Sequence, residues 1–447
     1  ADFRPKRLKE YQVPEKLRSE VRRQIQELLE MGLIKISNSP MASPLICALK
    51  GPGGREGIRL VMDYRFLNKY TVSDALGPPD IGSAMQRIGN AKFISTFDGK
   101  SSYWAIPLKE EDQWLTAFVC EGQTYEWTRA AFGLKNSGSA FLRMIERVLH
   151  PVRDFVESFV DDMAVHTETT WDMHLEHIKA FLETVRRSGL TLSLKKVSLA
   201  QPEVRFCGFF VGSGGRRIDP DRLASIRGLK VPKSKKEVRS VLGVFSWFRE
   251  FVPFYSDLAH PLIDLTKSAV PNKIPWNSRH QQAFDNLKEA LSEAANRALS
   301  IIDWRLPFEI ATDASNLAVA GVLFQTSSEG KPCPISFFSK KLTDAQRNWP
   351  VIEREALGVL TGLQKFKTWI FGYRIVAYCD HNPLAYLTDS ASKSPRLLRW
   401  ALALQSYDLE FRYSAGNSAL MGVPDCLSRM GPDVGEGGRW ASAHQVT

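Results

Sequence analysis

The spacing of apolar residues along the chain predicts an alternation of helices and strands. Leu17, Val21, Ile25 and Leu28 recur at the spacing of one helix face, and Gly32 marks the end of that run. Runs rich in β-branched and aromatic residues are typical of strands. Strands are expected at residues 45–49, 58–64, 93–98, 125–127, 204–211, 307–313, 318–324, 334–338, 374–380 and 409–413. Helices are expected at residues 14–32, 175–189, 276–294 and 353–369. A further helix is expected to follow a loop at 131–138 and to end at residue 149, and another is expected to begin at residue 424.

The stretch from Ser158 to Val165 joins two apolar runs through an adjacent pair of carboxylates, Asp161 and Asp162. Side chains of a flat strand alternate between its faces, so such a strand cannot aim both carboxylates at one point. A tight hairpin turn can place one of them in a site and leave the other at its rim. Hairpin turns favour Asn and Gly, so an Asp-Asp turn indicates that these residues serve a function other than forming the turn. A solvated acidic turn is the simpler alternative.

Composition indicates a globular protein of about three modules, at roughly 150 residues for each. The 447 residues are 44% hydrophobic and 24% charged, and the net charge of +10 suggests a polyanionic partner, although a basic surface can also serve solubility alone. No apolar run approaches the ~20 residues that span a bilayer, so no membrane partner is expected. Six scattered cysteines argue against a zinc site or a disulfide framework and favour a reducing compartment.

Two changes in amino-acid composition divide the chain into modules. The glycine-rich stretch 212–215 marks one module boundary, and a second lies near Ala298. Between them, residues 227–239 carry six basic side chains and residues 241–254 are dense in aromatic ones. Basic and aromatic residues together suit a nucleic-acid track, whereas aromatic residues alone favour a helical core. We expect both, on opposite faces.

Two histidines, His174 and His177, lie three residues apart on an expected helix. No further candidate ligands lie nearby in the sequence, so packing or surface histidines are favoured over a metal pair.

Carboxylates at strand ends and helix starts form two sets. Asp98 and Asp161 each follow an apolar strand in the first module. Gathered carboxylates repel one another unless a cation is present, and ligand sets made only of oxygen select Mg²⁺ or Mn²⁺ over zinc. Two such ions can activate an attacking hydroxyl and stabilise a leaving oxygen in phosphoryl transfer. The last module offers a second set: Asp313, Glu355, Asp380 and Asp425.

Short motifs follow one another along the chain in a specific order. The first module carries DYRFLNK at 63–69, FDGKSSY at 97–103, FGLKNS at 132–137, FVDD at 159–162 and FCGF at 206–209. After it come the aromatic segment 241–254, TDAS at 312–315, EREAL at 353–357, CDHNPL at 379–384 and PDCLSR at 424–429. This series resembles the fingers motif, polymerase motifs A, B and C, primer grip, thumb and four RNase H motifs of the reverse transcriptase–RNase H segment of gypsy-type LTR retrotransposons (Metaviridae), which are related to retroviral reverse transcriptases.

The resemblance implies an α+β multidomain fold. A right-hand polymerase, with fingers and a palm built on an antiparallel sheet, is expected at 1–212 and a helical thumb at 213–298. An RNase H-like mixed α/β domain at 299–430 is expected to follow without a separate connection domain, and a disordered tail at 431–447. The implied function is RNA- and DNA-templated DNA synthesis with cleavage of RNA in RNA–DNA hybrids, by two-metal phosphoryl transfer.

The same resemblance implies the partners and the setting. The partners are an RNA template, a DNA primer, their hybrid and dNTPs. The chain is expected to be part of a larger polyprotein that works in the cytoplasm within a virus-like particle, and a homodimer stays open. Two alternatives also stay open: a catalytically silent architectural subunit of an asymmetric dimer, and an RNA replicase.

Residue roles are carried over from the matching motifs. The metal-binding and catalytic residues are expected to be Asp98, Asp161 and, less directly, Asp162 in the polymerase, and Asp313, Glu355, Asp380 and Asp425 in the nuclease, each set with two Mg²⁺ or Mn²⁺ ions. Glu355 rather than Glu353 matches the metal-binding glutamate. The expected nucleotide contacts are Lys50, Arg59, Gly99, Lys100, Tyr103 and Phe132. The expected nucleic-acid contacts are Phe206, Cys207, Gly208, Phe209 and Tyr413.

Tyr103 would reject the 2′-OH of a ribonucleotide, with plain core packing as its alternative. Either Lys195 or Lys196 would protonate the leaving pyrophosphate. Three positions depart from the usual motifs, since Phe159 replaces a Tyr, Gly138 stands where many relatives have Pro, and Tyr413 stands where most RNases H have a mobile histidine.

Overall fold

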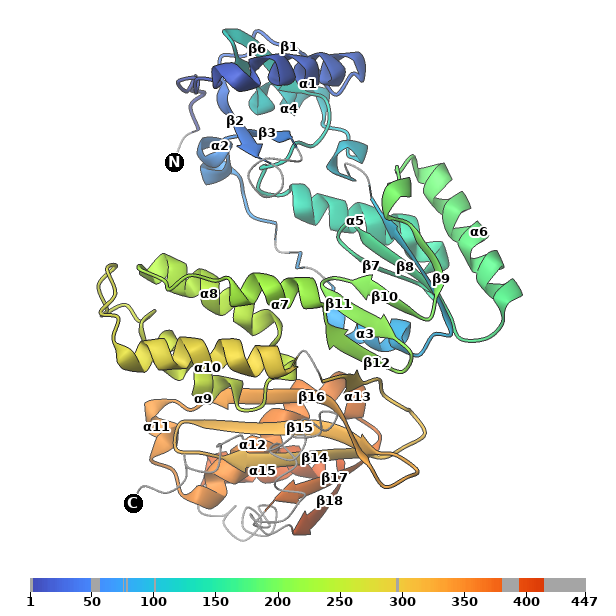
Figure 1. Ribbon diagram of the computed structural model, residues 1–447, viewed down its shortest axis with the longest axis vertical. Helices are drawn as coiled ribbons and strands as arrows, with labels where there is room; N and C mark the ends of the chain where they lie inside the picture. Colours follow the sequence, from blue (N-terminus) through green and yellow to red (C-terminus); the bar gives the residue numbers. More distant parts are fainter. Residues whose placement is uncertain are drawn as a thin grey trace. The chain divides into compact units, whose positions relative to one another are not determined.

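The computed structural model describes residues 3–49, 57–74, 76–77, 79–99, 102–294, 297–379 and 394–413. The chain forms two compact units, Ala1–Cys207 and Gly208–Thr447 (Figure 1). The unit boundary therefore lies ahead of the glycine-rich stretch 212–215, and the position near Ala298 lies inside the second unit.

A helix and a five-stranded sheet open the first unit. The helix α1 (Arg18–Glu30) follows a 3-10 turn and buries the apolar face that the sequence predicts, with Val21, Ile25 and Leu28 inside. These side chains pack with those of the sheet in one core. In sheet order, the strands are β1 (Ile34–Ile36), β6 (Gln123–Trp127), β5 (Phe118–Cys120), β2 (Ser43–Leu49) and β3 (Ile58–Met62).

A second, antiparallel sheet carries the acidic motifs of this unit. In sheet order, its strands are β7 (Val156–Phe159), β8 (Asp162–Thr167), β4 (Phe93–Asp98) and β9 (Ser198–Gln201). Phe97, Met163 and Val165 of this sheet form one core with the apolar faces of two helices. Those helices are α5 (Ser137–Leu149) and α6 (Trp171–Ser188). The described residues of this unit also form three shorter α-helices: α2 (Arg65–Tyr70), α3 (Ile81–Gly89) and α4 (Glu110–Gln113).

The strand expected at 204–211 is interrupted, so that part of the prediction is wrong. The strand β10 (Glu203–Phe206) ends at Cys207, and β11 (Phe209–Gly212) begins after Gly208. Cys207 and Gly208 both have positive φ, of 52° and 87°, which turns the chain tightly. The apolar composition could not reveal this turn, because only Gly208 signals it.

The second unit begins with a small antiparallel sheet and four helices. β11 pairs with β12 (Gly215–Ile218), and β12 pairs with β13 (Leu299–Ser300). Phe209 stacks on Phe251, and Phe245 packs on Phe284, so the aromatic residues build a core as expected. The helices are α7 (Pro220–Arg227), α8 (Lys235–Trp247), α9 (Tyr255–Asp264) and α10 (Ser278–Ala294).

A mixed five-stranded sheet forms the rest of this unit. In sheet order, its strands are β16 (Pro332–Lys341), β15 (Ala318–Thr326), β14 (Phe308–Ala314), β17 (Arg374–Cys379) and β18 (Asp408–Tyr413). The first three are antiparallel, and β17 and β18 continue parallel to β14. The helices are α11 (Asp344–Arg347), α12 (Val351–Lys365), α13 (Lys367–Ile370) and α15 (Pro395–Gln405). The expected α+β multidomain fold is confirmed.

The helix α15 was not predicted, although Leu397, Ala401 and Leu404 recur at helical spacing and are buried. None of the described helices is long and apolar enough to cross a membrane.

Candidate active sites

The acidic motif of the first unit forms a two-residue turn between β7 and β8. Phe159 pairs with Asp162, so the turn is centred on Val160 and Asp161 rather than on the two aspartates. Val160 has a φ of 53°, which is rare for a β-branched residue and indicates that the surrounding structure imposes the turn. Asp161 therefore lies in the turn while Asp162 begins a strand, which separates the two carboxylates as expected.

Asp98 lies beside this turn because β4 pairs with β8. Asp98 at the end of β4 is opposite Asp162, and the Gly99 N–H donates to the Asp161 carbonyl at 2.9 Å. The strand register thus brings Asp98, Asp161 and Asp162 to one edge of the sheet.

The charges at this edge are only partly balanced. Lys196 Nζ donates to both carboxylate oxygens of Asp98, at 2.9 and 3.1 Å. Asp161 Oδ1 is buried and has no hydrogen-bond partner among the described residues. Burial, with the nearby Asp98 carboxylate, raises the pKa of Asp162. A cation would relieve each of these costs.

This carboxylate set fits a hard divalent ion such as Mg²⁺, because the donors are all oxygens and one of them is buried without a partner. Asp98 and Asp161 are the residues that would hold such an ion. Within the described part of the chain, no group of three or more His, Cys, Asp or Glu side chains is arranged to hold a metal.

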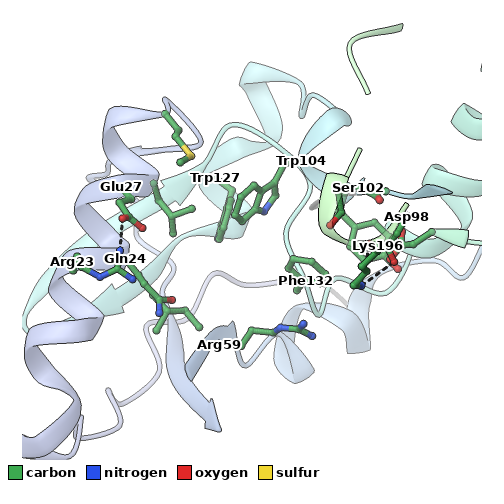
Figure 2. A pocket seen from close by; sticks show the side chains of 17 residues that line it. Arg23, Gln24, Glu27, Arg59, Asp98, Ser102, Trp104, Trp127, Phe132 and Lys196 are labelled. Carbon is green, nitrogen blue, oxygen red and sulfur yellow. Dashed lines mark hydrogen bonds and ion pairs between the residues drawn. The ribbon is translucent and has the colours of Figure 1, made fainter. Parts of the chain in front are cut away.

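A pocket of about 530 Å³ opens beside these carboxylates. Figure 2 shows Asp98 and Lys196 at one end of the pocket and Glu27 of α1 at the other, with Arg59 and Phe132 between them. The pocket thus joins acidic, cationic and aromatic side chains.

Four of the six expected nucleotide contacts line this pocket together: Arg59, Gly99, Tyr103 and Phe132. The Arg59 guanidinium lies 5.6 Å from the centre of the Phe132 ring, and the Tyr103 ring meets Phe132 edge-on at 5.1 Å. The other two, Lys50 and Lys100, lie outside the described residues.

Tyr103 both packs in the core and lines the pocket. Its ring packs edge-on against Phe141 in the core and also lines the pocket. Burial and the nearby Asp161 carboxylate raise its pKa, so the hydroxyl is neutral near pH 7. Gly138 stands where many relatives have Pro. A Cβ at this position would lie 3.9 Å from the Tyr103 hydroxyl, which is an ordinary van der Waals distance.

The two candidate lysines differ in their contacts. Lys196 contacts Asp98 and lines the pocket, while Lys195 is not among the pocket residues. Trp127 and the face of α1 with Arg23 and Glu27 also form walls of the pocket, which the sequence did not indicate. No local pattern marks them, because they reach the pocket only through the fold.

The expected nucleic-acid contacts at the β10–β11 region need a correction. The Phe206 and Phe209 side chains are only 1% and 3% exposed, so neither ring is available to nucleic acid. The Cys207 thiol donates to Asp162 Oδ2 at 3.9 Å, and burial raises the pKa of this thiol. Cys207 and Gly208 are both partly exposed and stay candidates.

The second expected site lies at the end of β14. Asp313 is exposed there and accepts a hydrogen bond from the Ala314 N–H at 2.7 Å. The side chain of Glu355 on α12 is buried. Asp380 and Asp425 lie outside the described residues, as does the side chain of Tyr413.

Helix α12 runs antiparallel to β14, which brings Glu355 level with the end of β14 where Asp313 lies. A Cβ at Gly362 would meet Ile310, and a Cβ at Gly358 would meet Thr312. The step from Gly362 to Gly358 covers about 6 Å along the helix, and the step from Ile310 to Thr312 covers about 6.6 Å along the strand. One more helical turn toward the start of α12 therefore puts Glu355 level with the end of β14.

Glu353 has a different partner from Glu355. Two residues along a helix correspond to about 200° of rotation, so the two side chains leave α12 on opposite sides. Arg396 of α15 forms an ion pair with Glu353, and its guanidinium lies 4.0 Å from the centre of the Trp349 ring. This contact is consistent with Glu355 as the candidate ligand.

The two histidines on α6 are packing residues. The His174 ring nitrogens contact Ser95 at 2.8 Å and Thr167 at 2.9 Å, and the His177 ring stacks on Phe155. These contacts agree with the sequence-based preference against a metal pair.

Two family models match the chain in order. "Reverse transcriptase (RNA-dependent DNA polymerase)" matches residues 49–211, and "RNase H-like domain found in reverse transcriptase" matches residues 303–407.

Curated relatives align with nearly the whole chain. The Pol polyproteins of the transposons opus and gypsy from Drosophila melanogaster are 33% and 31% identical to it, over 96% and 92% of the chain. The Tf2-3 polyprotein of Schizosaccharomyces pombe is 28% identical over 95% of the chain. The chain covers only 43%, 40% and 31% of these three polyproteins, in the same order.

Solved structures of a foamy viral protease–reverse transcriptase share the fold. The complex with double-stranded DNA has a TM-score of 0.76 and 26% identity, with 93% of this chain and 87% of that chain covered. The complex with an RNA/DNA hybrid has a TM-score of 0.72 and 26% identity, with coverage of 93% and 56%. Together with the motif order and the family models, these matches lead to one conclusion: the chain carries a reverse transcriptase domain followed by an RNase H-like domain, and it is similar to the Pol polyproteins of gypsy-type retrotransposons.

Proposed function

We propose that the chain is an RNA-directed DNA polymerase with ribonuclease H activity. The observation that carries this proposal is the pocket of about 530 Å³, which joins the Asp98 and Asp161 carboxylates to Arg59, Tyr103 and Phe132. A nucleoside triphosphate needs all of these features, because it presents phosphates, a sugar and an aromatic base.

In this proposal, Asp98 and Asp161 hold two divalent ions, and Asp162 supports the turn. When bound, the ions supply charge that activates an attacking hydroxyl and stabilises a leaving oxygen. Arg59 binds the triphosphate through its guanidinium, which suits phosphate oxygens. Tyr103 lies under the sugar, and Phe132 contacts the nucleotide.

Lys196 is the proposed proton donor to the leaving pyrophosphate. Its Nζ lies within 3.1 Å of both Asp98 oxygens, so it already contacts the group that would hold the metal. An ion held by Asp98 would compete with this contact, and the Lys196 ammonium would then be free to reach the phosphates.

For the nuclease, we propose that Asp313 and Glu355 act with Asp380 and Asp425 to cleave the RNA strand of a hybrid. The register of α12 on β14 supports the first two. A polyanionic substrate agrees with the net charge of +10 and with the hybrid bound by the foamy viral relative. Because the relatives are Pol polyproteins, we place the chain within a longer polyprotein in a cytoplasmic virus-like particle.

Primer extension on an RNA template with Mg²⁺ tests the polymerase. Asp161→Asn is expected to reduce the incorporation rate by about 10³-fold or more, because a neutral amide is a poor ligand for Mg²⁺. Asp154→Asn is the matched control, since the Asp154 side chain is 93% exposed and lies outside the pocket. Equal rates for wild type and Asp161→Asn would contradict the polymerase assignment and leave the architectural-subunit alternative.

A further inference from the structure

A fully buried arginine lies between the two parts of the second unit. The Arg216 side chain of β12 has an exposed fraction of 0%. Its Nη2 donates to Glu250 Oε2 and to the Ile335 carbonyl, each at 3.0 Å. Its guanidinium also lies 5.7 Å from the centre of the Phe251 ring. A buried charge is costly unless it is paired, so the Arg216 guanidinium favours the one arrangement in which Glu250 and the Ile335 carbonyl both reach it.

The network continues into the nuclease-like domain. Lys365 Nζ, at the end of α12, lies 3.4 Å from Glu250 Oε1. Arg216 and Lys365 lower the pKa of Glu250 although its burial acts in the opposite direction. Arg216 and Glu250 belong to the proposed thumb region, whereas Ile335 and Lys365 belong to β16 and α12. The same helix α12 carries Glu355.

Further polar contacts cross the same boundary. Lys341 Nζ at the end of β16 donates to Asp264 Oδ1 of α9 at 2.7 Å. The hydroxyl oxygens of Ser256 and Ser339 lie 3.0 Å apart. In addition, the Ile301 N–H donates to the Gly214 carbonyl at 3.0 Å.

We propose that residues 213–298 and the nuclease-like domain move as one body, and that Arg216 is the positioning residue that sets their geometry through Glu250 and Lys365. The consequence is that the thumb sets the place on the hybrid where RNA is cut. The cut is then held at a fixed distance from the stretch of hybrid that the thumb grips, and its position does not depend on a flexible linker between these two parts. This inference rests on the proposed function.

The first test removes both members of the buried pair in the full chain. Arg216→Met with Glu250→Met removes the charges and leaves Lys365, which is 29% exposed, free to reach water. The readout is the distance of RNA cuts from the primer 3′ end on a hybrid with labelled RNA. We expect the share of cuts at the main position to fall by about two-fold or more, with an unchanged rate of primer extension.

Arg305→Met is the matched control, because the Arg305 side chain is 88% exposed. It is expected to keep the wild-type cutting positions. A folded Arg216→Met/Glu250→Met variant with the wild-type cutting positions would overturn the role of Arg216. A shift of the cutting positions without loss of primer extension supports it, since general destabilisation lowers both activities.

A cross-link tests the single body without removing the network. The double variant Ser256→Cys/Ser339→Cys brings two sulfur atoms close together, and oxidised glutathione supplies the oxidant for the bond. We expect the bond to form in the folded enzyme and to leave the cutting positions and both rates unchanged. Failure of the bond to form, or cuts that shift in the oxidised enzyme and return on reduction, would overturn the proposal.

These outcomes separate the inference from the proposed function. A wild-type enzyme that neither extends primers nor cuts RNA contradicts the function. A wild-type enzyme that does both, with variants that cut at the same positions, contradicts only the coupling.

Discussion

Lys196 is the residue whose role the structure sharpens most. Its ammonium contacts both oxygens of Asp98, yet its side chain is 65% exposed and is free to move. Nothing in the Lys-Lys sequence distinguishes it from Lys195. The distinction comes from a 3-10 turn at Leu194–Lys196, which places successive side chains in different directions.

Lys196→Met is expected to lower the rate of single-nucleotide incorporation by about 10²-fold, because a positioned acid typically contributes that much or more. Lys195→Met is the matched control and should stay near the wild-type rate. Rapid-quench kinetics over a range of pH measure both. Equal rates for the two variants would remove Lys196 from the reaction.

Tyr103 contributes selectivity in our proposal. Replacement by Val removes the ring from the pocket and leaves the core contact with Phe141 incomplete. The ratio of dCTP to CTP incorporation is expected to fall by about ten-fold or more in Tyr103→Val. Tyr125→Val, which changes a tyrosine outside the pocket, is the control. A ratio that does not change would favour core packing alone, and efficient CTP use by the wild type would favour an RNA replicase.

At the scale of elements, the pocket depends on a clamp between α2 and the motif B loop. Asn68 Nδ2 donates to the Gly133 carbonyl, and the Lys135 N–H donates to Asn68 Oδ1, each at 2.8 Å. Gly133 has a φ of +97° and lies close to the Met62 carbonyl, so no other residue fits there without strain. Phe132, next to Gly133, is held in the pocket by this loop.

Asn68→Ala removes both hydrogen bonds of the clamp. We expect a loss of about 1–2 kcal/mol of unfolding free energy and a KM for dNTP that rises several-fold, with a smaller change in kcat. Asn286→Ala on α10 is the control. Urea unfolding and steady-state kinetics measure the two effects, and an unchanged KM would show that the clamp does not position Phe132.

At the scale of the whole molecule, acid stability depends on a buried histidine. Burial, reinforced by Arg87, lowers the pKa of His166 to about 4. Glu157 lies 3.9 Å from this ring but is already paired with Arg87. His174 and His177 also face His166 and oppose its protonation. The folded chain therefore keeps His166 neutral where an unfolded chain would bind a proton.

The sign of the pH effect follows from this lowered pKa. The neutral His166 contributes no penalty above about pH 6.5, the ordinary pKa, and stability is lost as the pH falls toward 4. Between pH 7 and 5, we expect a loss of about 2 kcal/mol in unfolding free energy, measured by urea titration. His166→Gln should show a shallower loss, whereas an identical pH profile would contradict the assignment.

The sequence by itself determined the order of the motifs, the two sets of acids, the aromatic core around Phe245, most strands and the long helices α1, α5, α6, α10 and α12. Local spacing and composition encode these features, because each depends on neighbours along the chain. It also predicted a tight turn at the acidic pair, which lets Asp161 and Asp162 point in different directions.

Only the tertiary structure decided the centre of that turn, the burial of Phe206 and Phe209, the contact of Lys196 with Asp98 and the charge network of Arg216. Each depends on strand register or on packing between distant segments. A one-residue change of register moves every side chain of a strand to the other face, and no local pattern records which partner lies there.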